Sequence, residues 1–260
     1  MPLSLFTPID DWLVPPPEAK KVEWIAKFTF AHRGQHGAGV PENSPSAFAS
    51  AIGQGLGIEC DIQRTGDGQA VVFHDWELDR LTEASGPVAE KSAERLARIT
   101  LSGSSDRIAT LRQLLDLVAG RVPLLIEVKS RRDLLFAGLC AAIHADLKDY
   151  SGRYAVMSFD PRVSRWFANN SPTTVRGLVV TEEGGKGIAG SLRRRLSFWH
   201  ARPEFLAYDI RDLPGPFPSE QRQRGIPVAT WTVRTPELNE RAHAHADAPI
   251  AEGAGLEMTS

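Results

Sequence analysis

The chain has 260 residues, 42% of them hydrophobic, so it is long enough to bury a full core as one α/β domain. Its formal net charge of −2 leaves no basic surplus for a nucleic-acid backbone, which excludes general nucleic-acid binding and favours a small-molecule substrate. The two cysteines, Cys60 and Cys140, form neither a CxxC pair nor a disulfide framework. Residues 1–30 carry no continuous apolar segment, and no other stretch approaches membrane-spanning length, so we expect a cytoplasmic protein.

Strands and helices are predicted to alternate along most of the chain. Residues 1–24 have the prolines and charges of an irregular N-terminal arm, and residues 25–260 form the main domain. Between 75 and 108 the apolar periodicity weakens around glycine, proline and serine clusters, which indicates a lid-like insertion. The first predicted strand ends at residue 31, and the others are 56–62, 123–128, 154–158, 175–180, 204–208, 226–231 and 248–251. Residues 70–73 are predicted to form a short hairpin partner of the strand 56–62. The predicted helices are 44–55, 111–119, 133–147 and 162–168.

The eight main strands are apolar and are separated by helices, a pattern typical of a parallel sheet covered on its outer face. Eight such strands in a domain of about 250 residues predict a single-domain TIM (β/α)8 barrel. A doubly wound open sheet is the main structural alternative.

Paired carboxylates on the second strand are the first candidates for chemistry. Glu59 and Asp61 are two residues apart, so both side chains point to one face of the strand, where they can bind a single hard cation. An ordinary polar strand edge is the alternative. Glu127 and Lys129 repeat this spacing at the end of a very apolar strand, which is where barrel enzymes carry their chemistry. Oxygen ligands alone favour Mg²⁺ or Ca²⁺ over zinc.

Two histidines supply a candidate acid–base pair. His32 ends the first strand beside Arg33, whose guanidinium can bind two phosphate oxygens. His74 ends its own short strand and offers a second imidazole. One imidazole can accept a proton and the other can donate one, as P–O cleavage at neutral pH requires. Either histidine alone would more often be structural.

Three further residues have two interpretations each. Glu42 and Asn43 either cap the following helix or contact the substrate, since asparagine is favoured at helix N-termini. Trp231 ends the seventh strand, where its ring either walls a substrate pocket or packs in the core.

The chain resembles the glycerophosphodiester phosphodiesterase family. The resemblance rests on motifs that run in family order: AHRG (31–34), PENS (41–44), the block 58–82, IEVK (126–129), SFDP (158–161) and WTV (231–233). It implies a TIM barrel that hydrolyses glycerophosphodiesters to sn-glycerol 3-phosphate and an alcohol with a divalent cation. By motif match, the implied metal ligands are Glu59, Asp61 and Glu127, the acid–base pair is His32 and His74, the phosphate-binding residues are Arg33 and Lys129, and the residues lining the first-strand loop are Glu42 and Asn43.

Several points stay open on the sequence alone. Family members commonly have a Thr-Asp near a proline in the last strand, whereas this chain has Asp247 to Gly253 without it. The alternatives are a barrel phospholipase D-type enzyme acting on lysolipids and a non-catalytic barrel that binds phosphodiesters. The alcohol head group, the choice between Mg²⁺ and Ca²⁺, the roles of the two histidines, a direct or cyclic-phosphate route, and homo-oligomer formation are also undecided.

Overall fold

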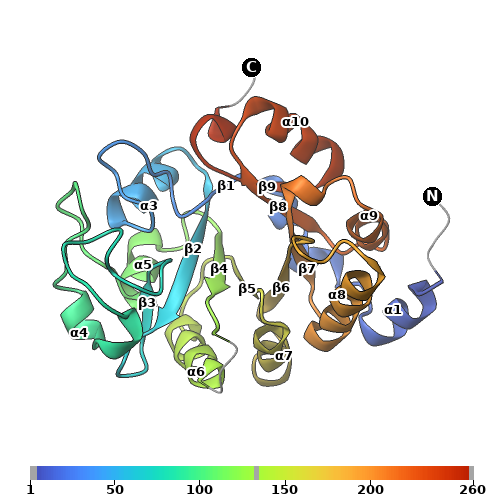
Figure 1. Ribbon diagram of the computed structural model, residues 1–260, viewed down its shortest axis with the longest axis horizontal. Coiled ribbons are helices and arrows are strands. Elements are labelled where there is room, and N and C mark those ends of the chain that lie inside the picture. The colour runs from blue at the N-terminus through green and yellow to red at the C-terminus, as the bar shows by residue number, and fades with distance from the viewer. Residues whose placement is uncertain (1–4, 132–134, 258–260) are drawn as a thin grey trace. The chain divides into compact units, whose positions relative to one another are not determined.

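The computed structural model describes residues 5–131 and 135–257, in which strands and helices alternate (Figure 1). The strands are β1 (Phe30–Ala31), β2 (Gly57–Arg64), β3 (Ala70–Val72), β4 (Leu124–Val128), β5 (Tyr154–Ser158), β6 (Val175–Val180), β7 (Phe205–Asp209), β8 (Val228–Val233) and β9 (Ala248–Ala251). The α-helices are α1 (Thr7–Leu13), α2 (Ala19–Val22), α3 (Pro45–Gly53), α4 (Ala93–Leu96), α5 (Leu111–Val118), α6 (Phe136–Leu147), α7 (Pro161–Asn170), α8 (Ile188–Ala201), α9 (Pro216–Gln223) and α10 (Pro236–His245). The 3-10 helices are η1 (Ile25–Lys27), η2 (Val88–Glu90), η3 (Ile210–Asp212) and η4 (Gly253–Leu256).

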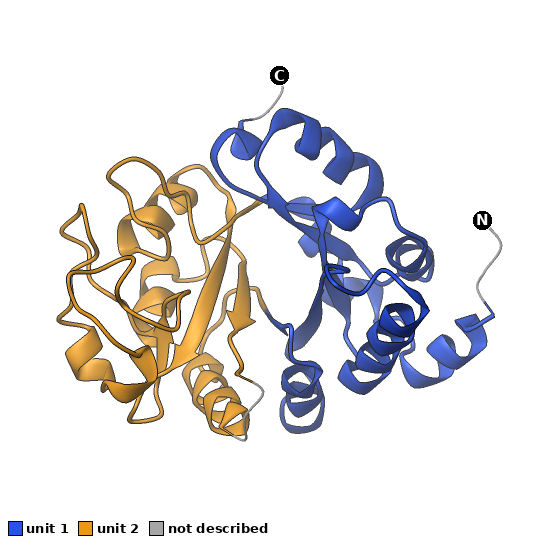
Figure 2. Cartoon of the chain, viewed as in Figure 1, with its two compact units in different colours: residues 1–29, 156–260 blue, residues 30–155 orange. Residues whose placement is uncertain are grey.

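The fold class is the TIM (β/α)8 barrel that the strand pattern predicts. Within the described residues, eight parallel strands succeed one another in chain order, and β3 is an added antiparallel strand beside β2. The expected hairpin partner at 70–73 is therefore confirmed. The chain divides into two compact units, residues 30–155 and residues 1–29 with 156–260, which Figure 2 colours separately.

The unit of residues 30–155 is organised around β2. Its first seven residues are buried, it pairs in parallel with β1 and β4, and its far end turns back into β3. Thr110 and Gln113 form a reciprocal capping box that fixes the start of α5. The segment 75–108 has its own apolar cluster, in which Leu78, Val88 and Leu96 pack against Phe73. This segment is therefore packed through its own core, and its role as a lid stays a prediction.

The unit of residues 1–29 and 156–260 contains β6 to β9, paired in parallel in chain order. Helix α1 belongs to this unit through the buried carboxylate of Asp10, which binds Arg195 and accepts a 2.6 Å hydrogen bond from the Trp199 indole. The division into an arm over 1–24 and a barrel over 25–260 stays a prediction. Residues 133–134 of the predicted helix 133–147 lie outside the described residues, and α6 begins at Phe136. Over 5–131 and 135–257, we find no helix whose length and hydrophobicity would let it cross a bilayer.

Candidate active site

The register of β2 and β4 brings two of the expected carboxylates together. In this parallel pair Asp61 lies opposite Glu127, and Glu59 lies two residues earlier on the same face of β2. Carboxylate oxygens of all three side chains lie within 4.8 Å of one another. The predicted ligand set is therefore assembled by strand pairing, because the alternation of a strand fixes the side-chain directions.

The end of β1 supplies the next two candidates. β1 pairs with the start of β2, so His32 and Arg33 leave the sheet beside Glu59. His32 Nε2 lies 4.0 Å from Glu59 Oε2, and the backbone N–H of Arg33 donates to the same oxygen at 3.0 Å. Arg33 and Asn43 both adopt positive φ angles, 56° and 55°, which non-glycine residues rarely do outside constrained functional loops.

The end of β3 positions the second histidine. The N–H of Phe73 donates to the carbonyl of Asp61 at 3.0 Å, which brings the chain back beside β2 just before His74. The Nδ1 atom of His74 lies 2.7 Å from Asp75 Oδ1. A carboxylate on one ring nitrogen fixes the imidazole and directs the other nitrogen, Nε2, to proton exchange. The expected acid–base residue therefore has a built-in orienting partner.

The carboxylates carry a large electrostatic cost. Glu59 and Asp61 are each 2% exposed. Burial, together with the charges of Asp61 and Glu127, raises the pKa of Glu59 well above its usual range, and burial also raises the pKa of Glu127. Burial alone would raise the pKa of Asp61 as well, but the charges of Lys129 and His74 lower it. Such a buried group of oxygens fits a hard divalent cation, which would offset their mutual repulsion.

Two cations share the same cluster. Lys129 Nζ lies 3.1 Å from Glu127 Oε1 and 3.4 Å from Asp61 Oδ1. Arg33 Nε lies 3.3 Å from Asp61 Oδ2. Burial alone would lower the pKa of both cations, yet the neighbouring carboxylates raise the pKa of each. Both side chains therefore stay charged at neutral pH and can hold a phosphate group.

The loop before α3 orients Asp61 through Asn43. The Asn43 side chain donates from Nδ2 to Asp61 Oδ2 at 2.9 Å and accepts from the Asp61 N–H at 3.2 Å. Ser44, and not Asn43, caps α3, because Ser44 Oγ accepts the N–H of Ala47 at 3.1 Å. The capping interpretation of Asn43 is thus wrong, and its contact with substrate stays a prediction. Asn43 is a residue that holds a candidate metal ligand in place.

Gly34 lets this loop pack closely against α3. Its φ is +77°, and a Cβ there would lie 2.9 Å from both Ala47 and Phe48. We expect Gly34→Ala to lower the free energy of unfolding by about 1 to 3 kcal/mol, measured by denaturant unfolding, because the new side chain meets both strain and a clash. Gly39→Ala is the matched control, since Gly39 has a φ of +75° but open space around it. Equal losses in the two variants would contradict the steric argument.

One participating residue, Arg80, has no signal in the sequence. Its guanidinium donates to Glu42 Oε1 at 2.7 Å and to Asp75 Oδ2 at 2.5 Å. Glu42 in turn accepts from Arg33 Nη1 at 2.7 Å. A continuous chain of charge-assisted hydrogen bonds therefore runs from Arg33 through Arg80 to the carboxylate that orients His74. The direct contact of Glu42 with substrate stays a prediction.

The hydrogen bond from Arg80 and that from His74 lower the pKa of Asp75 to about 2, so its carboxylate is ionised throughout the neutral range. We expect Asp75→Asn to reduce kcat about 10- to 100-fold with little change in KM, because the variant loses the charge that orients and stabilises the His74 imidazolium. Glu83→Gln is the control, since Glu83 is exposed in the same segment and does not line the cavity beside His74. A change in KM alone would point to a binding role instead.

An open cleft lies beside His74. It encloses about 670 Å³ including its mouth, and its lining residues include His74, Asp75, Trp76, Arg80 and Lys129. This cleft gives a small ligand access to both His74 and Lys129, the candidate phosphate-binding lysine.

Trp231 lies on β8, in the unit of residues 1–29 and 156–260. Its indole N–H donates to the carbonyl of Ala207 at 2.9 Å, and its ring packs edge-on against Phe159 with centroids 5.5 Å apart. These contacts explain how the ring is held, and its role in substrate binding stays a prediction.

Comparisons with known proteins identify the family of the chain. The model of the family described as the glycerophosphoryl diester phosphodiesterase family matches residues 32–251. A glycerophosphodiester phosphodiesterase from Caldanaerobacter subterraneus subsp. tengcongensis is 28% identical over 225 residues, which cover 81% of this chain and 87% of that protein.

Two solved structures show the same fold. A phosphodiesterase from Oleispira antarctica, in complex with the product sn-glycerol-3-phosphate, has a TM-score of 0.78 at 22% identity, over 89% of this chain and 94% of that one. A glycerophosphodiester phosphodiesterase from Thermotoga maritima has a TM-score of 0.70 at 24% identity, over 86% and 93%. The resemblance expected from the motifs, with the phosphoric diester hydrolase class that it implies, is confirmed: the chain belongs to the glycerophosphoryl diester phosphodiesterase family.

Proposed function

We propose that the protein hydrolyses glycerophosphodiesters to sn-glycerol 3-phosphate and an alcohol, with a divalent cation bound by Glu59, Asp61 and Glu127. The observation that carries this proposal is the charge of the cluster. Three carboxylates face the two cations Arg33 and Lys129, so one divalent cation and one monoanionic phosphodiester together would bring the cluster to neutrality. Family membership and the product held by the Oleispira antarctica neighbour support the same reaction.

The donor set agrees with the proposed cation. All three ligands are carboxylates, which suit Mg²⁺ or Ca²⁺, and the raised pKa values of Glu59 and Glu127 reflect a buried charge that a cation would balance. When bound, the cation would polarise a phosphoryl oxygen and stabilise negative charge on it. The choice between Mg²⁺ and Ca²⁺ is part of the experiment below.

The protein's own side chains would bind the phosphate and transfer the protons. Arg33 and Lys129 hold the other phosphoryl oxygens. One of His32 and His74 takes the proton from the attacking hydroxyl, either of water or of the neighbouring glycerol carbon, as the new P–O bond forms. The other histidine donates a proton to the departing alkoxide as the second P–O bond breaks. A cyclic phosphate formed by the glycerol hydroxyl would be opened by water through the reverse roles.

Removal of the cation tests this proposal. We expect EDTA to reduce the release of sn-glycerol 3-phosphate from glycerophosphoglycerol by more than about 100-fold, and Mg²⁺ or Ca²⁺ to restore it, because the carboxylates then lose their shared counter-ion. Product is measured with a coupled dehydrogenase assay, with heat-inactivated protein as the background. Absence of product with either metal, across choline, ethanolamine, inositol and glycerol esters, would favour a non-catalytic binder. The expected cytoplasmic location and homo-oligomer formation stay predictions.

A further inference from the structure

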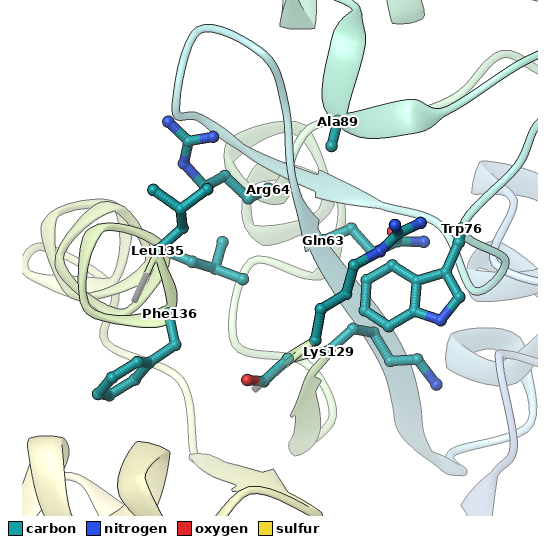
Figure 3. A pocket seen from close by; sticks show the side chains of 10 residues that line it. Gln63, Arg64, Trp76, Ala89, Lys129, Leu135 and Phe136 are labelled. Carbon is teal, nitrogen blue, oxygen red and sulfur yellow. The ribbon is translucent and has the colours of Figure 1, made fainter. Parts of the chain in front are cut away.

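A second cavity adjoins the cleft beside His74 and differs from it in character. It encloses about 410 Å³ including its mouth, and it shares Trp76 and Lys129 with the cleft. Figure 3 shows Trp76 on one side of this pocket and Leu135 and Phe136, from the start of α6, on the other, with Lys129 between them. Lys129 also lies 3.1 Å from the candidate ligand Glu127, so this pocket opens beside the proposed phosphate position.

Five of the ten described residues that line this pocket are apolar, and they form a continuous wall from its base to its rim. Leu139 is 1% exposed at its base, whereas Leu135 is 54% exposed at its rim. Phe136, Ala89 and the Trp76 ring complete the apolar surface. A methylene group bound here would be transferred from water to an apolar surface, and the free energy of this transfer is favourable by about 0.8 kcal/mol per group.

Among the described residues of this pocket, those that carry a charge are all basic. Arg64, Lys129 and Arg131 line it, and its described lining includes no carboxylate. The Arg131 guanidinium lies 4.6 Å from the Trp76 ring centroid, so the face that could otherwise bind a quaternary ammonium is already covered by a cation. Choline and ethanolamine groups are therefore disfavoured here by like charge. The neighbouring cleft, in contrast, is lined by Glu77 and Asp79.

We propose that the pocket of Trp76, Leu135, Phe136 and Leu139 binds an uncharged apolar arm of the phosphodiester, with the phosphate beside Lys129. The preferred substrate class is then an amphiphilic diester that carries an alkyl or acyl chain on one side. This inference rests on the proposed function and extends it from the reaction to the substrate.

Binding of n-alkyl phosphates tests the pocket without any turnover. We measure the dissociation constants of methyl, ethyl, propyl and butyl phosphate by calorimetry in the presence of Mg²⁺. Each added methylene is expected to tighten binding about fourfold until the pocket is full. Equal affinities along the series in the wild-type protein would overturn the proposal.

Leu135→Glu places a carboxylate at the rim of the pocket. In this variant each added methylene is expected to tighten binding less than about twofold. Leu196→Glu is the matched control, because Leu196 is 52% exposed on α8 and does not line the pocket. Circular dichroism checks that both variants fold. If the affinity of Leu135→Glu still rises with alkyl length as steeply as that of the control, the alkyl group binds elsewhere and the proposal is wrong.

Hydrolysis separates this inference from the proposed function. We expect kcat/KM for glycerophosphobutanol to exceed that for glycerophosphocholine at least about tenfold in the wild type, and Leu135→Glu to narrow this ratio. If both esters are hydrolysed with equal kcat/KM, the inference of an apolar subsite is wrong and the proposed function still stands. The opposite result is also informative. If affinity for alkyl phosphates rises with alkyl length, Leu135→Glu removes this rise, and no ester is hydrolysed, then the subsite is supported and the proposed function fails.

Discussion

Replacing Glu59 with glutamine is expected to reduce turnover at least about 100-fold and, with EDTA present, to raise the free energy of unfolding by about 1 to 2 kcal/mol at pH 8. Activity falls because a proposed ligand of the cation loses its charge. Stability rises because the ionised carboxylate is buried beside Asp61 and Glu127, and burial with these charges raises its pKa. The amide oxygen of the variant can still accept the Arg33 N–H that Glu59 Oε2 accepts in the wild type.

The sign of this stability effect depends on pH. The folded protein binds a proton at Glu59 more tightly than the unfolded chain does, so ionisation of Glu59 opposes folding at high pH. The stability difference between Glu59→Gln and the wild type should therefore shrink as the pH falls through the raised pKa. Thermal unfolding in EDTA at pH 8 and pH 5, with Glu94→Gln as an exposed control, measures it. Full metal-dependent turnover by Glu59→Gln would remove Glu59 from the ligand set.

Replacing His74 with alanine is expected to reduce kcat by about two to four orders of magnitude with the fold intact. The fold should survive because the His74 side chain is partly exposed and pairs with the neighbouring residue Asp75, so its loss leaves no cavity in the core. Steady-state kinetics on glycerophosphoglycerol measure the loss. His243→Ala, at an exposed position on α10, is the control and should turn over like the wild type.

A second substrate identifies the direction in which His74 moves its proton. A p-nitrophenyl ester of glycerol phosphate releases a phenolate that needs little protonation. If His74 is the acid, His74→Ala should hydrolyse this ester nearly as fast as the wild type does. If His74 is the base, the variant should lose activity on both esters equally. Unchanged turnover on the alkyl ester would exclude both roles.

The strand-borne part of the site could be predicted from the sequence. The spacing of Glu59 and Asp61 on an apolar strand sets their common face, and the barrel pattern places Glu127 at the same end of a neighbouring strand. Both inferences depend only on alternation and on parallel pairing. These properties are local or follow directly from the order of the strands.

The contacts that join the loop residues to one another could not be predicted. Arg80 binds Glu42, which is 38 residues earlier, and no periodicity relates the two. The contact between Asp75 and His74 depends on side-chain rotamers after β3, which no sequence pattern indicates. Asn43 was open between two roles because both Asn43 and Ser44 are good caps, and only the loop path assigns the cap to Ser44.

The pairing of Asp61 opposite Glu127 has a practical consequence for redesign. These two carboxylates belong to hydrogen-bonded strands, whereas Trp76 follows the end of β3 and Leu135 and Phe136 lie at the start of α6. A mutant library that randomises Leu135 and Phe136, which do not line the cleft beside His74, would therefore vary the proposed apolar subsite while the carboxylates on β2 and β4 keep their positions. On the proposed assignment, selectivity and chemistry belong to different elements, so each can be evolved on its own.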